Sequence, residues 1–275
     1  MNFIQAFILG VIQGLTEFIP VSSTAHLLIG QELLRIPASE EVFAFLVIIQ
    51  TGTILSLIIY FRDDLWNILK SFFVHLKDIK HFKSMPYDAR LGWYIIIATI
   101  PALIGGYFLR DALENLFNKP FLGAAIRLIT AAIIMVLGEM LGRYGKTLES
   151  VNWKDSLFIG MMQIIAVFPG ASRSGTTISA GLLRKFDRPS AARFAFLISI
   201  PVMLAAGGYE ILQFIGSGGI SNYLPSLVIG FIVSAVVGWF AVRWLLGYLS
   251  KHSLIPFAIY CLVVGLVCFA WSILL

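Results

Sequence analysis

Long apolar runs alternate with short polar stretches along this chain. Six of the runs approach or exceed the roughly 20 residues that an α-helix needs to cross the hydrocarbon core of a bilayer. The pattern therefore predicts an all-α polytopic membrane protein with six full transmembrane helices. We place these helices at about 42–61, 91–109, 120–141, 194–215, 225–247 and 254–275.

Two further apolar segments, about 3–34 and 156–185, are interrupted near the middle by proline and polar residues. The interruptions read PVSSTAH (20–26) and PGASRSGTT (169–177). Backbone that is not helical at membrane depth persists only where protein or a water-filled cavity surrounds it. We interpret both segments as re-entrant helical hairpins whose polar breaks meet near the membrane midplane.

The chain also repeats itself at an offset of about 150 residues. The segment GVIQGLTEFIPVSS, starting at Gly10, aligns with GMMQIIAVFPGAS, starting at Gly160, and FAFLVII (43–49) aligns with FAFLISI (194–200). Three predicted crossings separate the second pair, so the two halves insert with opposite orientation. We expect an inverted-topology repeat, approximately 1–141 and 156–275, within a single transmembrane domain that covers 1–275. Such repeats place a binding site where their broken segments meet.

Composition supports a membrane protein. The chain is 59% hydrophobic and 13% charged, with a mean hydropathy of +0.89, whereas soluble domains carry about 25% charged residues. Most Lys and Arg residues fall in loops on the inner side if both termini face outward, as the positive-inside rule requires. The net charge of +5 therefore does not indicate a nucleic-acid partner. Aromatic residues in loop 62–90 suggest that part of this loop lies on the membrane surface.

The first break carries an acid, hydroxyls and an imidazole. Gln13 and Glu17 are four residues apart and share one helix face, and a carboxylate at this depth costs at least roughly 2.5 kcal/mol. Glu17 therefore needs a partner, a metal or a proton. Ser23 and His26, three residues apart, also share a face of the next helix. The alternative is that a serine only caps that helix and Glu17 lies among the headgroups.

The second break supplies a cation. The residues just before its helix leave free N–H groups that suit an anion. Arg173 adds a planar fork of donors that matches phosphate, and Ser174 and Thr177 add hydroxyls. The alternative is a Gly-Pro hinge with Arg173 paired structurally to Glu17, and the two interpretations are compatible in an empty site.

Together the two breaks suit hydrolysis of a phosphorylated lipid. A serine could attack phosphorus, His26 could move the proton, and a divalent cation on Glu17 could neutralise phosphate oxygens. Gln50 and Thr51 could edge the same cavity. Carboxylate, hydroxyl and arginine also line transport sites, so a transporter or flippase of an anionic isoprenoid lipid or small anion is the alternative function.

At these residues the sequence closely resembles the undecaprenyl-diphosphate phosphatase family, also called the bacitracin-resistance family. QGLTE matches its first motif, with Gln13 where the family also has an acid. FIPVSSTAH matches the adjoining Ser-Ser-Thr-Gly-His element, except that Ala25 replaces Gly, and PGASRSGTT matches the second motif without a mismatch. The resemblance covers essentially the whole chain.

The resemblance implies a multi-pass enzyme of the bacterial cell membrane that removes the terminal phosphate of a C55 isoprenoid diphosphate. It implies a site that opens to the outer side, use of Mg²⁺ or Ca²⁺, a role in peptidoglycan synthesis, and bacitracin resistance. Its partners are the polyprenyl diphosphate and membrane lipids, and it leaves open whether the protein forms a homodimer. Whether Ser23 or an activated water is the nucleophile also stays open.

The resemblance also carries site residues over by position. The catalytic set is Glu17, Ser23, His26 and Arg173, and the metal ligands are Glu17 and Gln13. The substrate-binding set is Gln13, Ser22, Thr24, Gly170, Ser172, Ser174 and Thr177.

Overall fold

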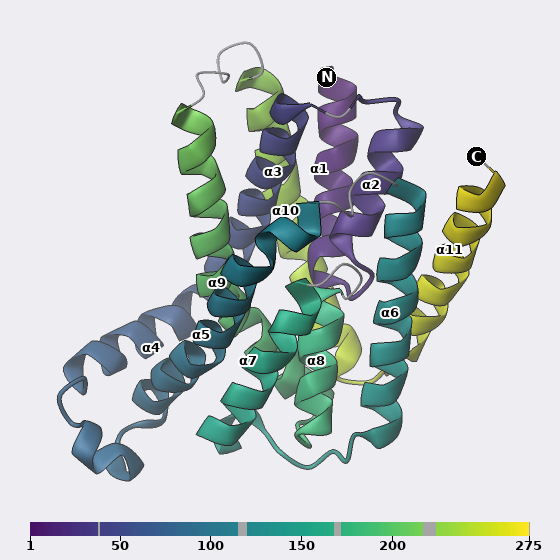
Figure 1. Cartoon of the computed structure of the whole chain (residues 1–275). Coiled ribbons are helices and arrows are strands. Elements are labelled where there is room, and N and C mark those ends of the chain that lie inside the picture. The colour runs from purple at the N-terminus through teal and green to yellow at the C-terminus, as the bar shows by residue number, and fades with distance from the viewer. Residues whose placement is uncertain (38, 115–119, 168–171, 217–223, 275) are drawn as a thin grey trace.

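The computed structural model describes residues 1–37, 39–114, 120–167, 172–216 and 224–274 of the 275-residue chain, and the described residues form helices and connecting turns without a β-strand. Eleven α-helices and two short 3₁₀ helices occur in these ranges (Figure 1). In chain order they are α1 (Phe3–Phe18), α2 (Ser23–Leu33), α3 (Glu40–Tyr60), α4 (Arg62–Val74), η1 (Ile79–Ser84), α5 (Tyr87–Glu114), α6 (Pro120–Leu141), η2 (Leu148–Ser150), α7 (Trp153–Val167), α8 (Arg173–Leu183), α9 (Arg188–Gly216), α10 (Leu224–Leu249) and α11 (Ile255–Leu274).

Six of the described helices are long and apolar enough to cross a membrane, which confirms the predicted number. Their candidate spans are Val42–Tyr60, Tyr87–Phe108, Pro120–Leu141, Arg188–Tyr209, Leu224–Leu249 and Ile255–Leu274. The largest difference from the sequence prediction is the start of α9 at Arg188, six residues before the predicted one. The prediction began at the repeated FAFL segment, whereas the helix continues through the small residues Ser190 and Ala191 that precede it.

The four helices around the two breaks are shorter. α1 and α7 have 16 and 15 residues, and α2 and α8 have 11 each. At 1.5 Å per residue these lengths are roughly 16–24 Å, less than the roughly 30 Å of a bilayer's hydrocarbon core. α1 and α2 lie side by side, as do α7 and α8 (Figure 1).

Glycines let two pairs of helices approach closely. A Cβ at Gly10 of α1 would lie 2.9 Å from the carbonyl oxygen of Gly230 in α10. A Cβ at Gly160 of α7 would lie only 2.4 Å from the carbonyl oxygen of Ala98 in α5. Small residues at such contacts are the usual means by which membrane helices pack backbone to backbone. Gly10 and Gly160 are the residues that start the aligned repeat segments.

Ion pairs of two acidic residues connect helices at the lower end of the bundle in Figure 1, where α6 and α8 end and α7 and α9 begin. Asp155 of α7 is fully buried and binds the Nζ of Lys146 at 2.9 Å and the Nε of Arg184, just after α8, at 2.7 Å. Because two cations share one carboxylate, this cluster holds the end of α8 opposite to Arg173. We name this lower end of the bundle the basic end.

A second acid at the basic end is Glu139 of α6. Its carboxylate accepts hydrogen bonds from Arg188 at 2.7 Å and from the backbone N–H of Leu254 at 2.7 Å. Tyr144 also donates to it, and burial, reinforced by Glu139, raises the pKa of the Tyr144 phenol to about 12. The phenol therefore stays protonated near neutral pH, and Glu139 ties α6 to the starts of α9 and α11.

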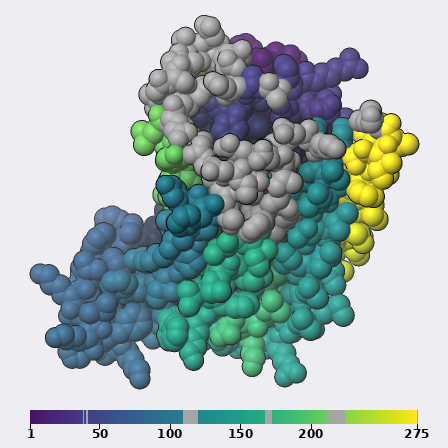
Figure 2. All heavy atoms as spheres, viewed as in Figure 1, coloured from purple at the N-terminus to yellow at the C-terminus, as the bar shows by residue number. Residues whose placement is uncertain are grey.

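The loop predicted to lie partly on the membrane surface contains helix α4. Ile68 on its inner face is buried, and Phe72 packs against Trp93 of α5 with ring centroids 5.1 Å apart. Trp66 and Phe73 are about two-thirds exposed, at 69% and 66%. The segment α4–η1 projects from the lower end of the bundle beside α5 (Figure 2). An amphipathic helix with exposed aromatic residues fits the predicted surface position, which stays a prediction.

Candidate active site

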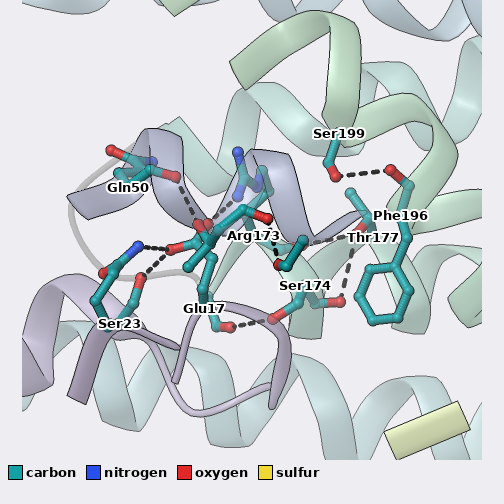
Figure 3. Close-up of polar contacts among 12 residues, drawn as sticks. Glu17, Ser23, Gln50, Arg173, Ser174, Thr177, Phe196 and Ser199 are labelled. Carbon is teal, nitrogen blue, oxygen red and sulfur yellow. Dashed lines mark hydrogen bonds and ion pairs between the residues drawn. The ribbon is translucent and has the colours of Figure 1, made fainter. Parts of the chain in front are cut away.

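The two polar breaks, far apart in the sequence, lie together in the fold. A Cβ built on Gly175, in the first turn of α8, would lie 3.4 Å from the Cβ of Pro20 in the first break. Arg173, the first residue of α8, forms an ion pair with Glu17 near the end of α1 (Figure 3). The sequence interpretation that one break faces the other therefore agrees with these contacts.

Local backbone rules explain the first break. α1 ends at Phe18, and Ile19, which precedes Pro20, is extended at φ −59° and ψ 129°, as residues before proline prefer. Ser22 has φ 67° and ψ 91°, a left-handed conformation that non-glycine residues rarely adopt. α2 then begins at Ser23. The chain thus reverses within four residues, and this reversal brings Ser23 back toward Glu17.

The second break begins α8 with a serine cap. The Oγ of Ser172 accepts a hydrogen bond from the N–H of Gly175 at 3.2 Å, which satisfies one of the free donors of the first turn. The same hydroxyl lies 3.1 Å from the Oγ of Ser174. Gly170, predicted to contact the substrate, lies outside the described residues.

Glu17 is the centre of the site. Its side chain is 4% exposed, and its Oε2 accepts hydrogen bonds from Gln13 Nε2 at 2.8 Å and from Ser23 Oγ at 2.7 Å. Its Oε1 accepts from Nη2 of Arg173. A buried carboxylate is stable when it is paired and hydrogen-bonded in this way. Four of the sequence-predicted residues therefore form one connected cluster, which we name the Glu17 cluster.

A small cavity of about 10 Å³ adjoins the cluster, room for about one water molecule. The Arg173 side chain borders this cavity and is 23% exposed. The complete lining is Glu17, Phe18, Arg173, Ser174, Thr177, Ala195, Phe196 and Ser199. The α9 residues were not among the predicted site residues. Their only sequence signal is the repeated FAFL segment, which contains Ala195 and Phe196.

Gln13 bears on whether a metal ion fits this site. Its Oε1 is buried and has no hydrogen-bond partner among the described residues, although its amide nitrogen is engaged by Glu17. In the part of the chain that the structure describes, no group of three or more His, Cys, Asp or Glu could hold a metal. One carboxylate and one free amide oxygen nevertheless fit Mg²⁺, which prefers one or two carboxylates completed by water and substrate phosphate.

His26 lies beside the cluster and makes other contacts. Its Nδ1 is 3.0 Å from the carbonyl oxygen of Ser22, and its Nε2 is 2.8 Å from the hydroxyl of Tyr260 in α11. Ser23, predicted to share a helix face with His26, donates its hydroxyl hydrogen to Glu17. The sequence did not indicate Tyr260, because this residue lies in an apolar helix 234 residues after His26 and belongs to neither motif.

The remaining predicted residues have different surroundings. Thr177 lines the cavity, and its hydroxyl donates to the carbonyl of Arg173 at 2.7 Å. Thr24 is exposed on the first turn of α2. Gln50 is an exposed residue of α3, and the Thr51 hydroxyl donates to the carbonyl of Ile48 at 2.7 Å.

Comparison with known proteins decides the family. A family model described as bacitracin resistance protein BacA matches residues 6–267. The chain belongs to this family. A relative from Acidothermus cellulolyticus, named undecaprenyl-diphosphatase, is 40% identical over 261 residues, which cover 94% of this chain and 93% of the relative. A relative of the same name from Methanobrevibacter smithii is 38% identical over 280 residues, with 99% of both chains covered.

Membership of the BacA family confirms the resemblance that the two motifs indicated. Those motifs are the segments that meet in the structure, because QGLTE contributes Gln13 and Glu17 and PGASRSGTT contributes Arg173. In this BacA-family chain, both motifs therefore contribute to one hydrogen-bonded cluster.

Proposed function

We propose that this protein is a membrane hydrolase that converts undecaprenyl diphosphate to undecaprenyl phosphate and inorganic phosphate. The product is the lipid carrier that is reused in peptidoglycan synthesis, and bacitracin resistance follows from the family description. The relatives named undecaprenyl-diphosphatase support the substrate. The single observation that carries the proposal is the Glu17 cluster, which joins an acid, a hydroxyl and a cation across the two breaks.

The first chemical step uses the hydrogen bond between Ser23 and Glu17. Arg173 releases Glu17 and grips two oxygens of the terminal phosphate with its planar fork of donors. The Oγ of Ser23 forms a bond to the terminal phosphorus, and its proton passes to the Glu17 carboxylate, 2.7 Å away in this structure. The bond from that phosphorus to the bridging oxygen breaks, and undecaprenyl phosphate leaves as the anion.

The second step regenerates the serine. A water molecule attacks the phosphoserine phosphorus, the bond from phosphorus to the Ser23 Oγ breaks, and both hydrogens of the water leave with inorganic phosphate as H₂PO₄⁻. The Glu17 carboxyl, protonated in the first step, is suited to return that proton to Ser23 as the new bond breaks. Arg173 neutralises the phosphate oxygens in both steps, where their charge develops.

A divalent cation, Mg²⁺ or Ca²⁺, would be held by Gln13 Oε1 and the Glu17 carboxylate together with phosphate oxygens. It would supply charge neutralisation at the diphosphate. The Gln13 amide oxygen, which has no partner among the described residues, supports this proposal.

For the fold, we propose that α1–α2 and α7–α8 are re-entrant hairpins related by an inverted repeat. The matched glycines Gly10 and Gly160, each at a close helix crossing, support it. So do Gln13 and Gln163, which are 1% and 2% exposed and each have one buried oxygen without a partner among the described residues. The site then lies near the membrane midplane and opens to the outer side.

The inverted repeat also favours a second function, transport of an anionic isoprenoid lipid or small anion. Release of inorganic phosphate from undecaprenyl diphosphate by purified protein in detergent separates the two functions. An enzyme releases phosphate without a second compartment, and the variant Arg173→Ala should release almost none. A wild-type preparation that is well folded, supplied with Mg²⁺ and releases no phosphate would leave transport as the function.

A further inference from the structure

The residue before Ser23 holds an unfavourable backbone conformation. Ser22 has φ 67° and ψ 91°, and within the described part of the chain its side chain makes no capping hydrogen bond at the start of α2. Such left-handed serines persist only where surrounding contacts hold them. Because Ser22 directly precedes Ser23, any relaxation of Ser22 would move the Ser23 hydroxyl away from Glu17.

His26 supplies a contact that holds Ser22. The carbonyl oxygen of Ser22 accepts from the backbone N–H of His26 at 3.2 Å and lies 3.0 Å from the Nδ1 of the same residue. A carbonyl oxygen can only accept, so the Nδ1 must carry the hydrogen. In the neutral imidazole, Nε2 is then an acceptor.

Tyr260 of α11 completes this arrangement. Its hydroxyl lies 2.8 Å from the Nε2 of His26 and is positioned to donate to it, with the two rings 11° from parallel. The next residue, Cys261, places its Sγ 3.7 Å from the carbonyl oxygen of Pro20. Two consecutive residues of α11 therefore contact the first break.

We infer that His26 is a positioning residue, which holds Ser23 in place through the Ser22 carbonyl, and that Tyr260 fixes the His26 tautomer that does so. The inference rests on the proposed function only for the role of Ser23. The two ring nitrogens of His26 contact Ser22 and Tyr260, and the Ser23 hydroxyl donates to Glu17. This assignment replaces the proton-transfer role expected for His26 from the sequence.

Substitutions at His26 distinguish positioning from proton transfer. The side-chain amide nitrogen of Asn can take the place of Nδ1 as a donor to the Ser22 carbonyl, whereas Ala offers no donor. We expect His26→Ala to lower kcat by about 100-fold, the cost of misplacing a reacting group by about 1 Å. His26→Asn should retain kcat within about 10-fold of wild type, since it keeps the donor. Equal losses in the Asn and Ala variants would overturn the positioning role.

The tautomer can be measured without turnover. In ¹⁵N-histidine-labelled protein in detergent, the His26 signal, identified by its absence in His26→Asn, should be that of the Nδ1–H form. Tyr260→Phe should shift this signal because Nε2 loses its donor. Observation of the Nε2–H form in wild type would overturn the inference. Because this readout needs no substrate, its failure is distinguishable from failure of the proposed reaction.

Tyr260→Phe also has a kinetic consequence. Loss of one hydrogen bond should lower kcat by about threefold to tenfold and leave KM unchanged. It should have no further effect in a His26→Ala background. The matched control is Tyr248→Phe, since Tyr248 stacks on Trp244 of α10 and should keep wild-type kcat. An equal loss from Tyr260→Phe with and without His26 would contradict the relay from Tyr260 to Ser22.

Discussion

Glu17 is the residue on which the account depends, because three donors converge on one buried carboxylate. Gln13 and Ser23 share its Oε2, and Arg173 binds its Oε1. The sequence alone required a partner for this carboxylate, since an isolated charge at membrane depth is costly. It also named the partner, because PGASRSGTT holds the arginine of the opposite break. The contact of His26 with Tyr260 had no comparable signal.

Arg173→Lys tests whether the planar fork matters or only the charge. We expect kcat to fall at least about 10²-fold, the usual cost of removing one donor that acts in the transition state. Arg173→Ala should be worse, because it also leaves Glu17 without a cation. Steady-state kinetics in detergent decide this, and a Lys variant that changes only KM would make Arg173 a binding anchor.

Gln13 offers a test of the metal site that uses opposite substitutions at one position. Gln13→Glu adds a second carboxylate, so we expect half-maximal activity at about 10-fold lower Mg²⁺ concentration, because affinity rises with ligand charge. Gln13→Leu removes the free amide oxygen and should need more Mg²⁺. EDTA should abolish turnover of the wild type and leave its helical circular dichroism intact. Full activity in chelator, or the same Mg²⁺ dependence in all three proteins, would contradict this site.

At the scale of elements, the hydropathy pattern predicted the six candidate spans and the two interruptions, since apolar length and proline act locally. It did not predict how the helices pair. The contact of α7 with α5 depends on Gly160 meeting the backbone of Ala98, and that of α1 with α10 on Gly10 meeting Gly230. Such contacts join segments that no local pattern relates, although the repeat had already aligned the two glycines.

Gly160→Ala should separate α7 from α5. The new methyl would lie 2.4 Å from a backbone oxygen, which cannot move aside as a flexible side chain would. We expect a loss of about 1–3 kcal/mol in stability, as for other overpacked sites, and a lower midpoint of thermal unfolding in detergent.

The control is Gly247→Ala in α10, where a Cβ meets no atom of the described residues within 4 Å. This change should be neutral or stabilise by about 0.5–1 kcal/mol. If Gly160→Ala proved as stable as Gly247→Ala, the close crossing of α5 and α7 would be wrong.

At the scale of the whole molecule, the distribution of charged residues distinguishes the two ends of the bundle. The acids Asp155 and Glu139 and their cations lie at the basic end, as the excess of Lys and Arg in the predicted inner loops suggested. The sequence predicted this asymmetry from loop composition. It could not predict that Arg184 pairs with Asp155 and Arg188 with Glu139. The sequence offers each arginine several acidic residues as possible partners, and only the fold decides between them.

We expect the orientation in the membrane to follow this asymmetry, with the basic end on the inner side. A cysteine at Arg35, exposed between α2 and α3, should react with a membrane-impermeant maleimide on intact cells. A cysteine at Lys70, exposed on α4, should react only after the cells are permeabilised. The native Cys261 and Cys268 are buried and should give a low background. The reverse pattern would invert the orientation and place the site's opening on the inner side.

The most direct test of the central claim is the rate of phosphate release from undecaprenyl diphosphate by Ser23→Ala. If Ser23 is the nucleophile held by Glu17, this variant should lose at least about 10³-fold in kcat, as enzymes do when a nucleophile is removed. Ser250→Ala, an exposed serine just after α10 and outside the predicted site, should stay within about tenfold of wild type. A Ser23→Ala protein that is folded and retains kcat within tenfold would show that the Glu17 cluster does not act through Ser23.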